Sequence, residues 1–190
     1  MALIDTIRSR RAIRKYREEQ ITEEELNLIL EAGTFAPSAG GGQRTMIVAV
    51  QDRGLAKKIG RINASVMKRP NVGHVSADQP SIIDDPTILN GFYDAPTVCV
   101  IFNKGQNQYS ISDSFCTAEN MILEAYDLGV ASAIIGRAEM TFDNDFGRSL
   151  MKEWEIPEDY TARAFVILGY IDGEYPAVKP RKEGRVRIVR

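Results

Sequence analysis

The sequence predicts one α+β domain in which a mixed sheet of four or five short strands lies between helices. Short apolar runs typical of buried strands recur along the chain, and segments with apolar residues at helical spacing separate them. The chain has 190 residues, enough for one domain with a substantial core. No internal repeat or linker divides it. We therefore assign residues 1–190 to a single domain.

The N-terminal half contains a helix, a strand and a second helix. Thr22 with Glu25 three residues later is a capping box, which opens a helix. A glycine, Gly33, is expected to end that helix. Residues 46–50 are a short apolar run and predict a strand. The apolar residues within 55–66 recur at helical spacing, so an amphipathic helix is expected to follow the strand.

The C-terminal half adds three strands around a long apolar helix. Residues 97–102, 130–135 and 164–170 predict the strands, and residues 146–154 predict an amphipathic helix. Residues 112–128 form the longest expected helix, and apolar side chains cover almost its whole circumference. A helix that is apolar all round must be buried on all sides. In a chain of this size, that pattern predicts that a second subunit covers part of the helix.

Two segments have no single expected structure. Residues 68–94 form a long irregular segment with three prolines, which is either a lid over a pocket or a disordered insertion. The tail, residues 180–190, is basic, and its apolar residues alternate with charged ones. It is expected to add an edge strand, in its own subunit or in a neighbouring one.

The composition excludes several classes of protein. The net charge is −2, whereas a nucleic-acid-binding domain is usually basic as a whole. No apolar run approaches the roughly 20 residues of a membrane span, and Asp5 and Arg8 interrupt any signal-peptide core. Cys99 and Cys116 lie in apolar runs and are expected to be buried thiols of a cytoplasmic protein. The single histidine, His74, has no partner at metal-ligand spacing, so no metal site is expected.

The most unusual segment is a cationic stretch that follows a short helix expected over residues 2–8. The chain could leave that helix here as an extended segment, because basic and small residues alternate in the stretch. Such a density of positive charge needs an anionic partner, which could be a phosphate, a nucleic-acid backbone or an acidic surface. The six cationic residues are Arg8, Arg10, Arg11, Arg14, Lys15 and Arg17.

A second feature is a glycine-rich segment, residues 36–43, with the sequence Ala-Pro-Ser-Ala-Gly-Gly-Gly-Gln. It is either a flexible turn or a platform whose exposed backbone N–H groups bond a flat heterocycle. A basic triplet, residues 179–181, occurs late in the chain. No nucleophile elbow, P-loop or dinucleotide-binding glycine motif is present. These features together favour a phosphorylated planar cofactor that carries the chemistry.

The sequence resembles the FMN-dependent nitroreductase family over nearly its whole length. Residues 10–16 look like the opening arginine signature of the family, and residues 36–43 look like its Ala-Pro-Ser segment. Residues 94–96 and the helical run 118–130 resemble the middle of the family. Leu-Gly-Tyr at 168–170 and the basic triplet complete the order of motifs.

This resemblance implies a three-layer α+β sandwich with a mostly antiparallel sheet, in an intertwined homodimer with a flavin site at each interface. It implies FMN as cofactor, NADH or NADPH as reductant, and a small flat acceptor such as a nitroaromatic or a quinone, reduced by a ping-pong mechanism without a catalytic protein residue. The expected partners are therefore a second copy of the chain and the small acceptor, and neither a nucleic acid nor a membrane is expected. The cofactor-binding residues that it implies are Arg10, Arg11, Ala12, Arg14, Pro37, Ser38, Ala39, Gly41, Asn63, Ile135, Gly136, Lys179 and Arg181.

Three departures from the family pattern bear on substrate choice. Ala12 lacks the hydroxyl often found at its position, and Gly41 stands where the family commonly has asparagine. Arg44 and Thr45 replace a Pro-Trp pair, which changes one wall of the site. The alternative functions are a flavin-binding or flavin-processing protein without nitroreductase turnover, and a non-enzymatic anion-binding module.

Overall fold

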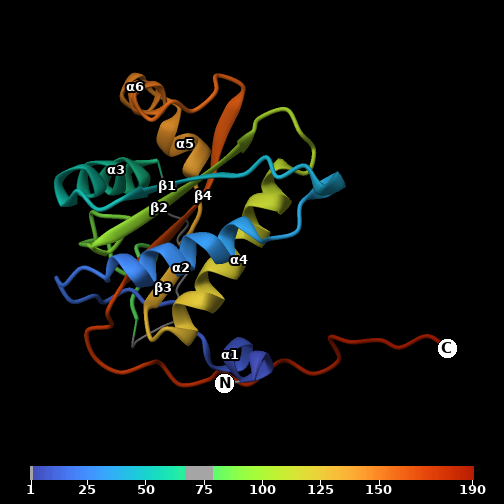
Figure 1. Ribbon diagram of the computed structural model, residues 1–190. Coiled ribbons are helices and arrows are strands. Elements are labelled where there is room, and N and C mark those ends of the chain that lie inside the picture. The colour runs from blue at the N-terminus through green and yellow to red at the C-terminus, as the bar shows by residue number, and fades with distance from the viewer. Residues whose placement is uncertain (1, 67–78) are drawn as a thin grey trace.

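One four-stranded antiparallel sheet forms the centre of the computed structural model, which describes residues 2–66 and 79–190 (Figure 1). The strand order is β1-β2-β4-β3, and every pair of neighbouring strands is antiparallel. The strands are β1 (Met46–Val50), β2 (Thr97–Lys104), β3 (Ala131–Ile135) and β4 (Tyr160–Gly169).

Helices cover both faces of this sheet. Helices α2 and α4 lie on one face, and α3, α5 and α6 lie on the other (Figure 1). The helices are α1 (Leu3–Ser9), α2 (Glu23–Thr34), α3 (Arg53–Ser65), α4 (Ser110–Asp127), α5 (Ala138–Phe142) and α6 (Asp145–Glu153), with a 3-10 turn η1 (Ala39–Gly41). The expected three-layer α+β sandwich is therefore confirmed.

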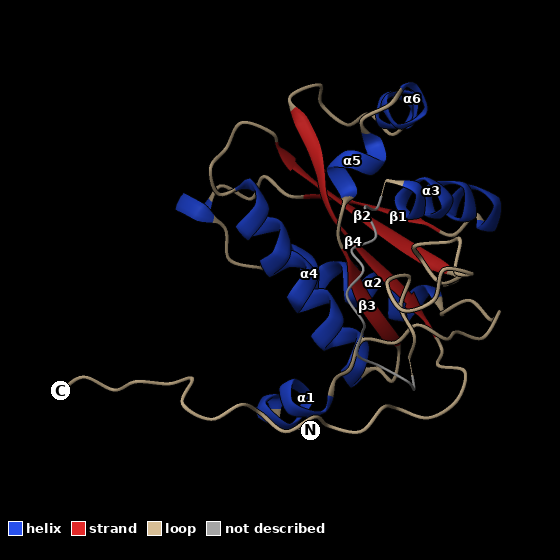
Figure 2. Ribbon diagram, turned by 180° about the vertical axis from the view of Figure 1, so that it is seen from behind, coloured by secondary structure: helices blue, strands red, loops and turns tan. Residues whose placement is uncertain are grey.

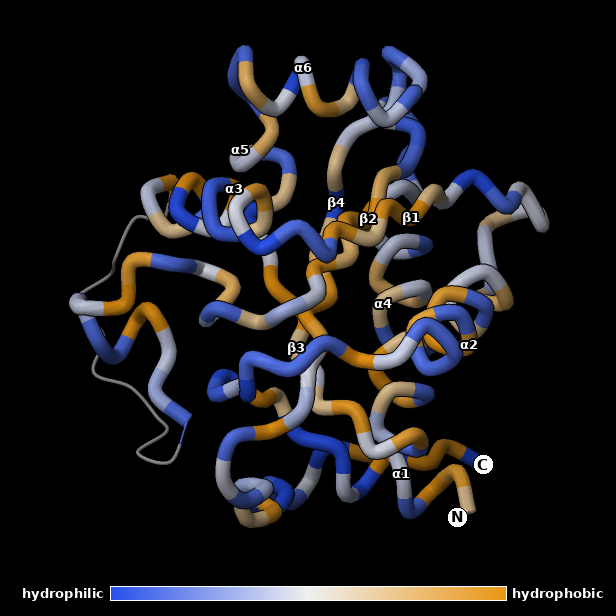
Figure 3. The backbone as a smooth tube through the Cα atoms, turned by 60° about the vertical axis from the view of Figure 1, so that its left-hand side comes forward, coloured by the Kyte–Doolittle hydropathy of each residue, from blue (hydrophilic) through white to orange (hydrophobic). Residues whose placement is uncertain are grey.

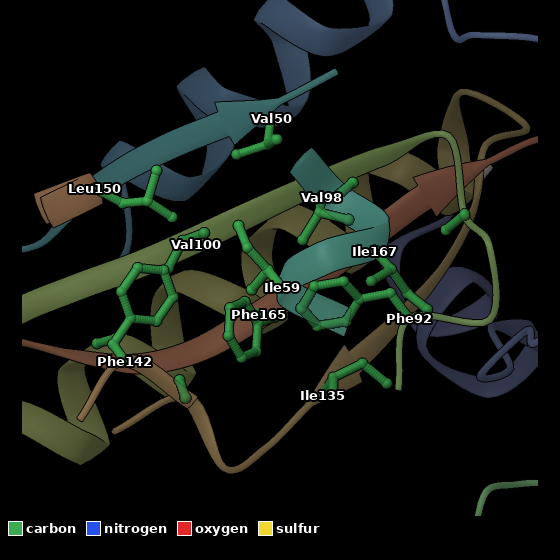
Figure 4. Close-up of a cluster of buried hydrophobic side chains, with 14 of the residues drawn as sticks. Val50, Ile59, Phe92, Val98, Val100, Ile135, Phe142, Leu150, Phe165 and Ile167 are labelled. Carbon is green, nitrogen blue, oxygen red and sulfur yellow. The ribbon is translucent and has the colours of Figure 1, made fainter. Parts of the chain in front are cut away.

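Alternation along the central strands explains why both faces are covered. Val98 and Val100 of β2 point to the layer of α3 and α5, whereas Cys99 and Ile101 point to the layer of α2 and α4. Successive residues of a strand face opposite sides, so a strand that is apolar at every position needs an apolar layer on each side. Figure 3 shows the hydrophobic residues concentrated along these strands. Figure 4 shows the buried apolar cluster between the sheet and the layer of α3, α5 and α6, in which Phe165 lies beside Phe92 and Phe142.

The cationic stretch leaves α1 as an extended segment along the sheet. Ala12 makes an isolated parallel bridge to Ser132 of β3, and Tyr16 makes an antiparallel bridge to Ile171. The backbone N–H of Ile13 donates to the carbonyl of Ser132 at 3.0 Å. The expected extended conformation is therefore present, and the parallel pairing expected for a mixed sheet is limited, among the described residues, to this one bridge.

The long helix α4 is amphipathic within one chain. Its buried residues, such as Ala118, Met121 and Ile122, face the sheet and α2. On the other side Ile111 is 57% exposed and Phe115 is 39% exposed. Ile111 and Phe115 thus leave apolar surface on this helix, and the expected burial of the helix by a second subunit stays a prediction.

Several element boundaries differ from those expected. Helix α2 runs through Gly33 to Thr34, because a Cβ at Gly33 would lie 2.8 Å from Met121 and 2.9 Å from Ile47, so the glycine serves close packing inside the helix. Helix α5 and η1 were not expected. Strand β4 begins at Tyr160, earlier than expected, because Tyr160 and Thr161 continue the pairing with the end of β2.

The two unassigned segments are only partly described. Residues 67–78 lie outside the described residues, and residues 79–94 are anchored to the fold, since Phe92 is 1% exposed and Gly91 donates to the carbonyl of Gly60 at 2.8 Å. The tail at 180–190 forms no strand and runs past α1 away from the body (Figure 2). The expected edge strand in its own subunit is therefore wrong, because its backbone leaves the sheet after Tyr170.

Candidate functional site

Three arginines from the two ends of the chain form the arginine cluster, which consists of Arg10, Arg11 and Arg181. Arg11 interacts electrostatically with both Arg10 and Arg181. The Nε of Arg10 and the Nη2 of Arg11 are buried, and neither has a hydrogen-bond partner within the described part of the chain. Buried N–H donors almost always have partners in folded proteins. Two unsatisfied guanidinium donors at one place therefore point to an anionic group that they are arranged to bind.

Electrostatics at the cluster favour an anion. Burial lowers the pKa of Arg11, and the positive charges of Arg181 and Arg10 lower it further, with only a small opposing contribution from Tyr126. Each of these effects disfavours the charged guanidinium. A bound anion with two negative charges, such as a phosphate monoester, would offset both the burial and the mutual repulsion.

Local contacts hold the cluster in place. The N–H of Arg10 donates to the carbonyl of Thr6 and closes α1. The guanidinium of Arg11 donates to the carbonyls of Arg8 at 2.8 Å and Arg10 at 2.5 Å, which fixes the turn into the extended segment. Only part of the Arg11 guanidinium is used in this way, so its Nη2 keeps its hydrogens for another partner.

The C-terminal segment reaches the cluster along a defined path. The N–H of Asp172 donates to the carbonyl of Lys15 at 3.0 Å. The ring of Tyr175 then packs edge-on against Tyr126 of α4, with ring centroids 5.5 Å apart. These contacts direct the following basic triplet toward Arg11. Arg181 of this triplet acts electrostatically on Arg11, and Lys179 is exposed.

Arg14, also expected in the cluster, has other contacts. Its backbone N–H donates to the side-chain oxygen of Gln79 at 2.6 Å, and its Nη1 donates to the Gln79 carbonyl at 3.2 Å. Its guanidinium also lies 5.8 Å from the ring centroid of Tyr93. Arg14 follows Arg11 by three residues of extended chain, about 10 Å. The structure therefore brings Arg10 and Arg11 together but directs Arg14 to a neighbouring site.

A second group of predicted residues lies at the far end of β3. Ile135 is buried and Gly136 follows it, and a Cβ built at Gly136 meets no atom within 4 Å. The surface over Gly136 is therefore open. Ser132 beside the arginine cluster and Gly136 are four residues apart on an extended chain, about 13 Å. The cluster and this open surface thus lie at opposite ends of one strand.

Asn63 of α3 fixes the backbone at Gly136. Its amide donates to the carbonyl of Gly136 at 3.0 Å and to the hydroxyl of Thr141 at 2.9 Å. Its side-chain oxygen accepts from the Nη2 of Arg137 at 2.7 Å. Asn63 is 0% exposed, so both amide hydrogens are used inside the chain. These contacts place Asn63 against the segment at Gly136, and the ring contact implied for Asn63 stays a prediction.

Arg137 is a residue that sequence reasoning passed over. Its backbone has φ 66°, a left-handed conformation that is unusual for a residue other than glycine. Its pKa is lowered by burial. Its side chain donates twice to Asn63, through Nε and Nη2. The sequence shows that the strand is followed by Gly136 and Arg137. The left-handed backbone of Arg137 and its hydrogen bonds to Asn63 become visible only in the fold.

The glycine-rich segment forms a loop around η1. Gly40 and Gly41 have φ values of 61° and 63°, and a Cβ at either would meet no atom within 4 Å. The N–H of Ala39 donates to both carboxylate oxygens of Asp113, at 3.2 and 3.3 Å. Ser38 accepts from the N–H of Gln43 through its hydroxyl at 3.0 Å. Pro37 precedes them and is exposed, so the loop presents an open and well-held surface.

This loop and the arginine cluster are far apart within one chain. The loop contacts α4 at Asp113, in its first turn, whereas α1 contacts α4 at Asp127, where the hydroxyl of Thr6 donates at 3.5 Å. Fourteen helical residues separate those two positions, which is about 21 Å. The structure therefore places the arginine cluster and the glycine-rich loop at opposite ends of α4 (Figure 1).

Two kinds of site are not found. In residues 2–66 and 79–190, no three His, Cys, Asp or Glu side chains are grouped so that they could hold a metal ion. Over the same residues, none of the helices combines the length and the apolar character that a membrane crossing requires.

Comparison with solved structures finds close likeness over the whole chain. A nitroreductase with bound FMN from Bacteroides fragilis is 28% identical, covers 100% of both chains and has a TM-score of 0.83. A nitroreductase with bound FMN from Desulfitobacterium hafniense shares the fold, with a TM-score of 0.80 over 98% of both chains at 23% identity.

Comparison of sequences agrees. A protein of Archaeoglobus fulgidus named "Putative NADH dehydrogenase/NAD(P)H nitroreductase" is 29% identical over 167 residues, which are 86% of this chain and 82% of that protein. The profile of the nitroreductase family matches residues 7–170. The match includes both ends of β3, the glycine-rich loop and the arginine stretch, so the chain belongs to the nitroreductase family.

Proposed function

We propose that this protein is an FMN-dependent oxidoreductase that passes hydride from NADH or NADPH, through the bound flavin, to a flat acceptor such as a nitroaromatic or a quinone. The two buried and unsatisfied guanidinium donors of Arg10 and Arg11 carry this proposal. Support also comes from the 28% identical Bacteroides fragilis nitroreductase, which has bound FMN.

The residues present fit FMN at both of its ends. The phosphate is the anion that the arginine cluster requires, and Arg181 adds positive charge at the same place. The open backbone surface at Gly136 suits one edge of a flat ring system. The cluster and Gly136 are separated by about 13 Å of strand, which leaves room for the ribityl chain between phosphate and ring.

Bound FMN supplies the two-electron redox chemistry, so the protein needs no nucleophile of its own. Arg10 and Arg11 bind its phosphate through charge-assisted hydrogen bonds, which are the stronger kind. Asn63 holds the Gly136 carbonyl and thereby fixes the peptide group that would receive the ring. Ala12 contributes its backbone next to Ser132 and no side-chain hydroxyl.

The glycine-rich loop completes the site in a homodimer. Pro37, Ser38, Ala39 and Gly41 are too far from the arginine cluster to act on the same cofactor within one chain, so we propose that a second copy supplies them. The surface between α1, α2 and α4 supports such pairing. It is a groove of about 560 Å³ in which Leu3 is 67% and Phe35 is 78% exposed.

Two segments are assigned to the same assembly. We propose that the tail at 180–190 exchanges with the partner, because it leaves its own body beside α1 (Figure 2). Lys179 and Arg181 then lie at the point where the two chains meet. The proposed lid concerns residues 68–94, of which 68–78 lie outside the described residues.

A kinetic experiment tests the proposed activity. Protein reconstituted with FMN is mixed anaerobically with NADH or NADPH, and oxidation of the reductant is followed with a nitroaromatic or a quinone as acceptor. Steady turnover with parallel double-reciprocal lines supports ping-pong transfer through a single site. A protein that binds FMN but gives no turnover, and instead loses flavin absorbance slowly under oxygen, would place it with the flavin-processing alternative.

A further inference from the structure

We propose that a cationic pocket beside the glycine-rich loop binds the carboxylate of an aromatic acceptor, with Arg44 as the residue that determines this specificity. The inference rests on the proposed function, since it names the acceptor class of that site. The Arg44 pocket has a volume of about 510 Å³ and lies against the backbone of residues 39–40. Its side chains are Arg44, Lys104, Gln106, Asn107 and Tyr109.

Arg44 is the uncompensated charge of this pocket. Its guanidinium lies over Gly42, in the space that a Cβ there would occupy, and its Nη1 donates to the carbonyl of Ala39 at 3.2 Å. Within residues 2–66 and 79–190, no carboxylate makes an ion pair with it. Lys104, in contrast, pairs with Asp159 at 3.0 Å. A guanidinium has five N–H donors, so Arg44 can hold Ala39 and still bind an oxyanion.

The opposite wall offers an aromatic face and an amide. Tyr109 is 49% exposed. The Asn107 side-chain oxygen accepts from the N–H of Tyr109 at 3.0 Å, and this bond does not use the amide NH2 of Asn107. An aromatic acceptor that carries a carboxylate has a flat apolar body and a planar anionic group, which match a tyrosine face and an arginine fork. The pocket therefore suits an aryl carboxylate better than a neutral or cationic arene.

The wall is held rigidly by an arginine from β4. Arg163 donates through Nε to the hydroxyl of Ser110 at 2.8 Å and through Nη2 to the carbonyl of Gly105 at 2.6 Å. Its Nη1 pairs with Glu139 at 2.6 Å. Because these contacts fix both ends of the loop 105–110, the loop side chains have a defined position relative to Arg44.

The pocket is connected to the proposed ring platform through one residue. Ala39 has its N–H held by Asp113 and its carbonyl held by Arg44. In the proposed dimer this residue lies along the flavin of the partner, so an acceptor on that ring extends toward Arg44. The charged groups around the pocket are Arg44, Lys104, Asp159 and the buried Asp113, and Asp113 lies behind the loop and is already bonded.

The test compares three acceptors of similar size in FMN-loaded protein with NADH as reductant. They are 4-nitrobenzoate, 4-nitrobenzamide and 4-nitrobenzylamine, which are anionic, neutral and cationic at pH 7. We expect the parent to prefer the benzoate over the benzamide in kcat/KM, and we expect Arg44→Gln to lower that ratio roughly tenfold, as loss of about 1.4 kcal/mol would. Arg44→Glu should reverse the order of the anionic and cationic acceptors.

Matched variants separate the charge of Arg44 from general effects. Arg148→Gln, at an exposed arginine of α6 that pairs with Asp143 and Asp145, should keep the ratio of the parent. Arg44→Lys keeps the charge and should keep most of the preference, and the acceptor order in Arg44→Glu serves as the test if Arg44→Gln fails to fold. An unchanged benzoate-to-benzamide ratio in Arg44→Gln, or a loss equal to it in Arg148→Gln, would overturn the inference.

Two further measurements show whether Arg44 binds the acceptor carboxylate or the phosphate of the reductant. They also separate this inference from the proposed function. Binding of benzoate, which is not reduced, is measured by calorimetry, and we expect Arg44→Gln to weaken it about tenfold, in line with one lost charge-assisted contact. If Arg44→Gln changes the NADPH-to-NADH ratio and leaves the acceptor ratio intact, Arg44 recognises the reductant's phosphate and our inference is wrong. Turnover of 4-nitrobenzamide without any acceptor preference would preserve the proposed function and refute this inference alone.

Discussion

Replacing Arg10 with glutamine tests the phosphate-binding role of the arginine cluster. Arg10→Gln removes the buried Nε donor that has no partner in the described chain, together with its positive charge. We expect FMN to bind more weakly, while riboflavin, which has the same ring but no phosphate, binds almost as it does to the parent. The difference between the two ligands isolates the contribution of the phosphate.

The size of the effect follows from the contact that is lost. A hydrogen bond to a charged group contributes about 1.5–3 kcal/mol. This range corresponds to roughly 10- to 150-fold in the dissociation constant for FMN. The substitution also removes one of the two positive charges that lower the pKa of Arg11. The protein without cofactor should therefore not lose stability, because repulsion within the cluster is reduced.

The assay is a titration of apoprotein with each flavin, followed by quenching of flavin fluorescence. Arg8→Gln is the matched control, since Arg8 lies in the last turn of α1, which Arg10 caps, and is exposed. Arg14→Gln should have a smaller effect than Arg10→Gln, because Arg14 is bonded to Gln79. If Arg10→Gln weakens FMN and riboflavin equally, or weakens neither, the cluster does not bind the phosphate and our reasoning is refuted.

Three further predictions concern other parts of the fold. Asn63→Ala should destabilise the protein by about 2–4 kcal/mol in urea unfolding, because it leaves buried partners unsatisfied, and an unchanged midpoint would contradict that role. Burial would raise the pKa of Glu25, but hydrogen bonds from Tyr170 and Thr22 lower it. Glu25→Gln should therefore cost about 1 kcal/mol at pH 7 and progressively less as the pH falls through the lowered pKa of Glu25, and equal costs at pH 7 and pH 3 would argue against it. Burial raises the pKa of Cys99 to about 12. In the folded Cys116→Ser variant, where Cys99 is the remaining cysteine, no reaction with a thiol reagent is expected at pH 8, and rapid labelling would show that Cys99 is accessible.

The sheet and most helices could be predicted because their signals are local. The apolar runs of β1 and β2 and the capping box of Thr22 and Glu25 each lie within a few residues, and the structure contains them. Helix α5 escaped prediction because it has only five residues, too few for a helical period to be visible. Gly33 was expected to end α2, but its role depends on Met121, which is far away in sequence.

The candidate site was predictable only as a set of segments. The arginine stretch predicted that the protein binds an anion. Only the fold shows that Arg181 interacts with Arg11, while Arg14 bonds to Gln79. Asn63 was expected to contact the ring, and its actual partners, Gly136 among them, lie more than 70 residues away in the chain. Long-range pairings of this kind leave no local pattern, so sequence reasoning could name the elements and not their contacts.

The most direct test of the central proposal is the ratio of flavin to protein in the purified dimer. Apoprotein is mixed with excess FMN, separated by gel filtration with light scattering, and its flavin absorbance is compared with its protein content. We expect one FMN per chain in a species of twice the chain mass, because each site needs the arginine cluster of one copy and the loop of the other. A monomer that retains FMN, or a dimer that retains none, would contradict the proposed site.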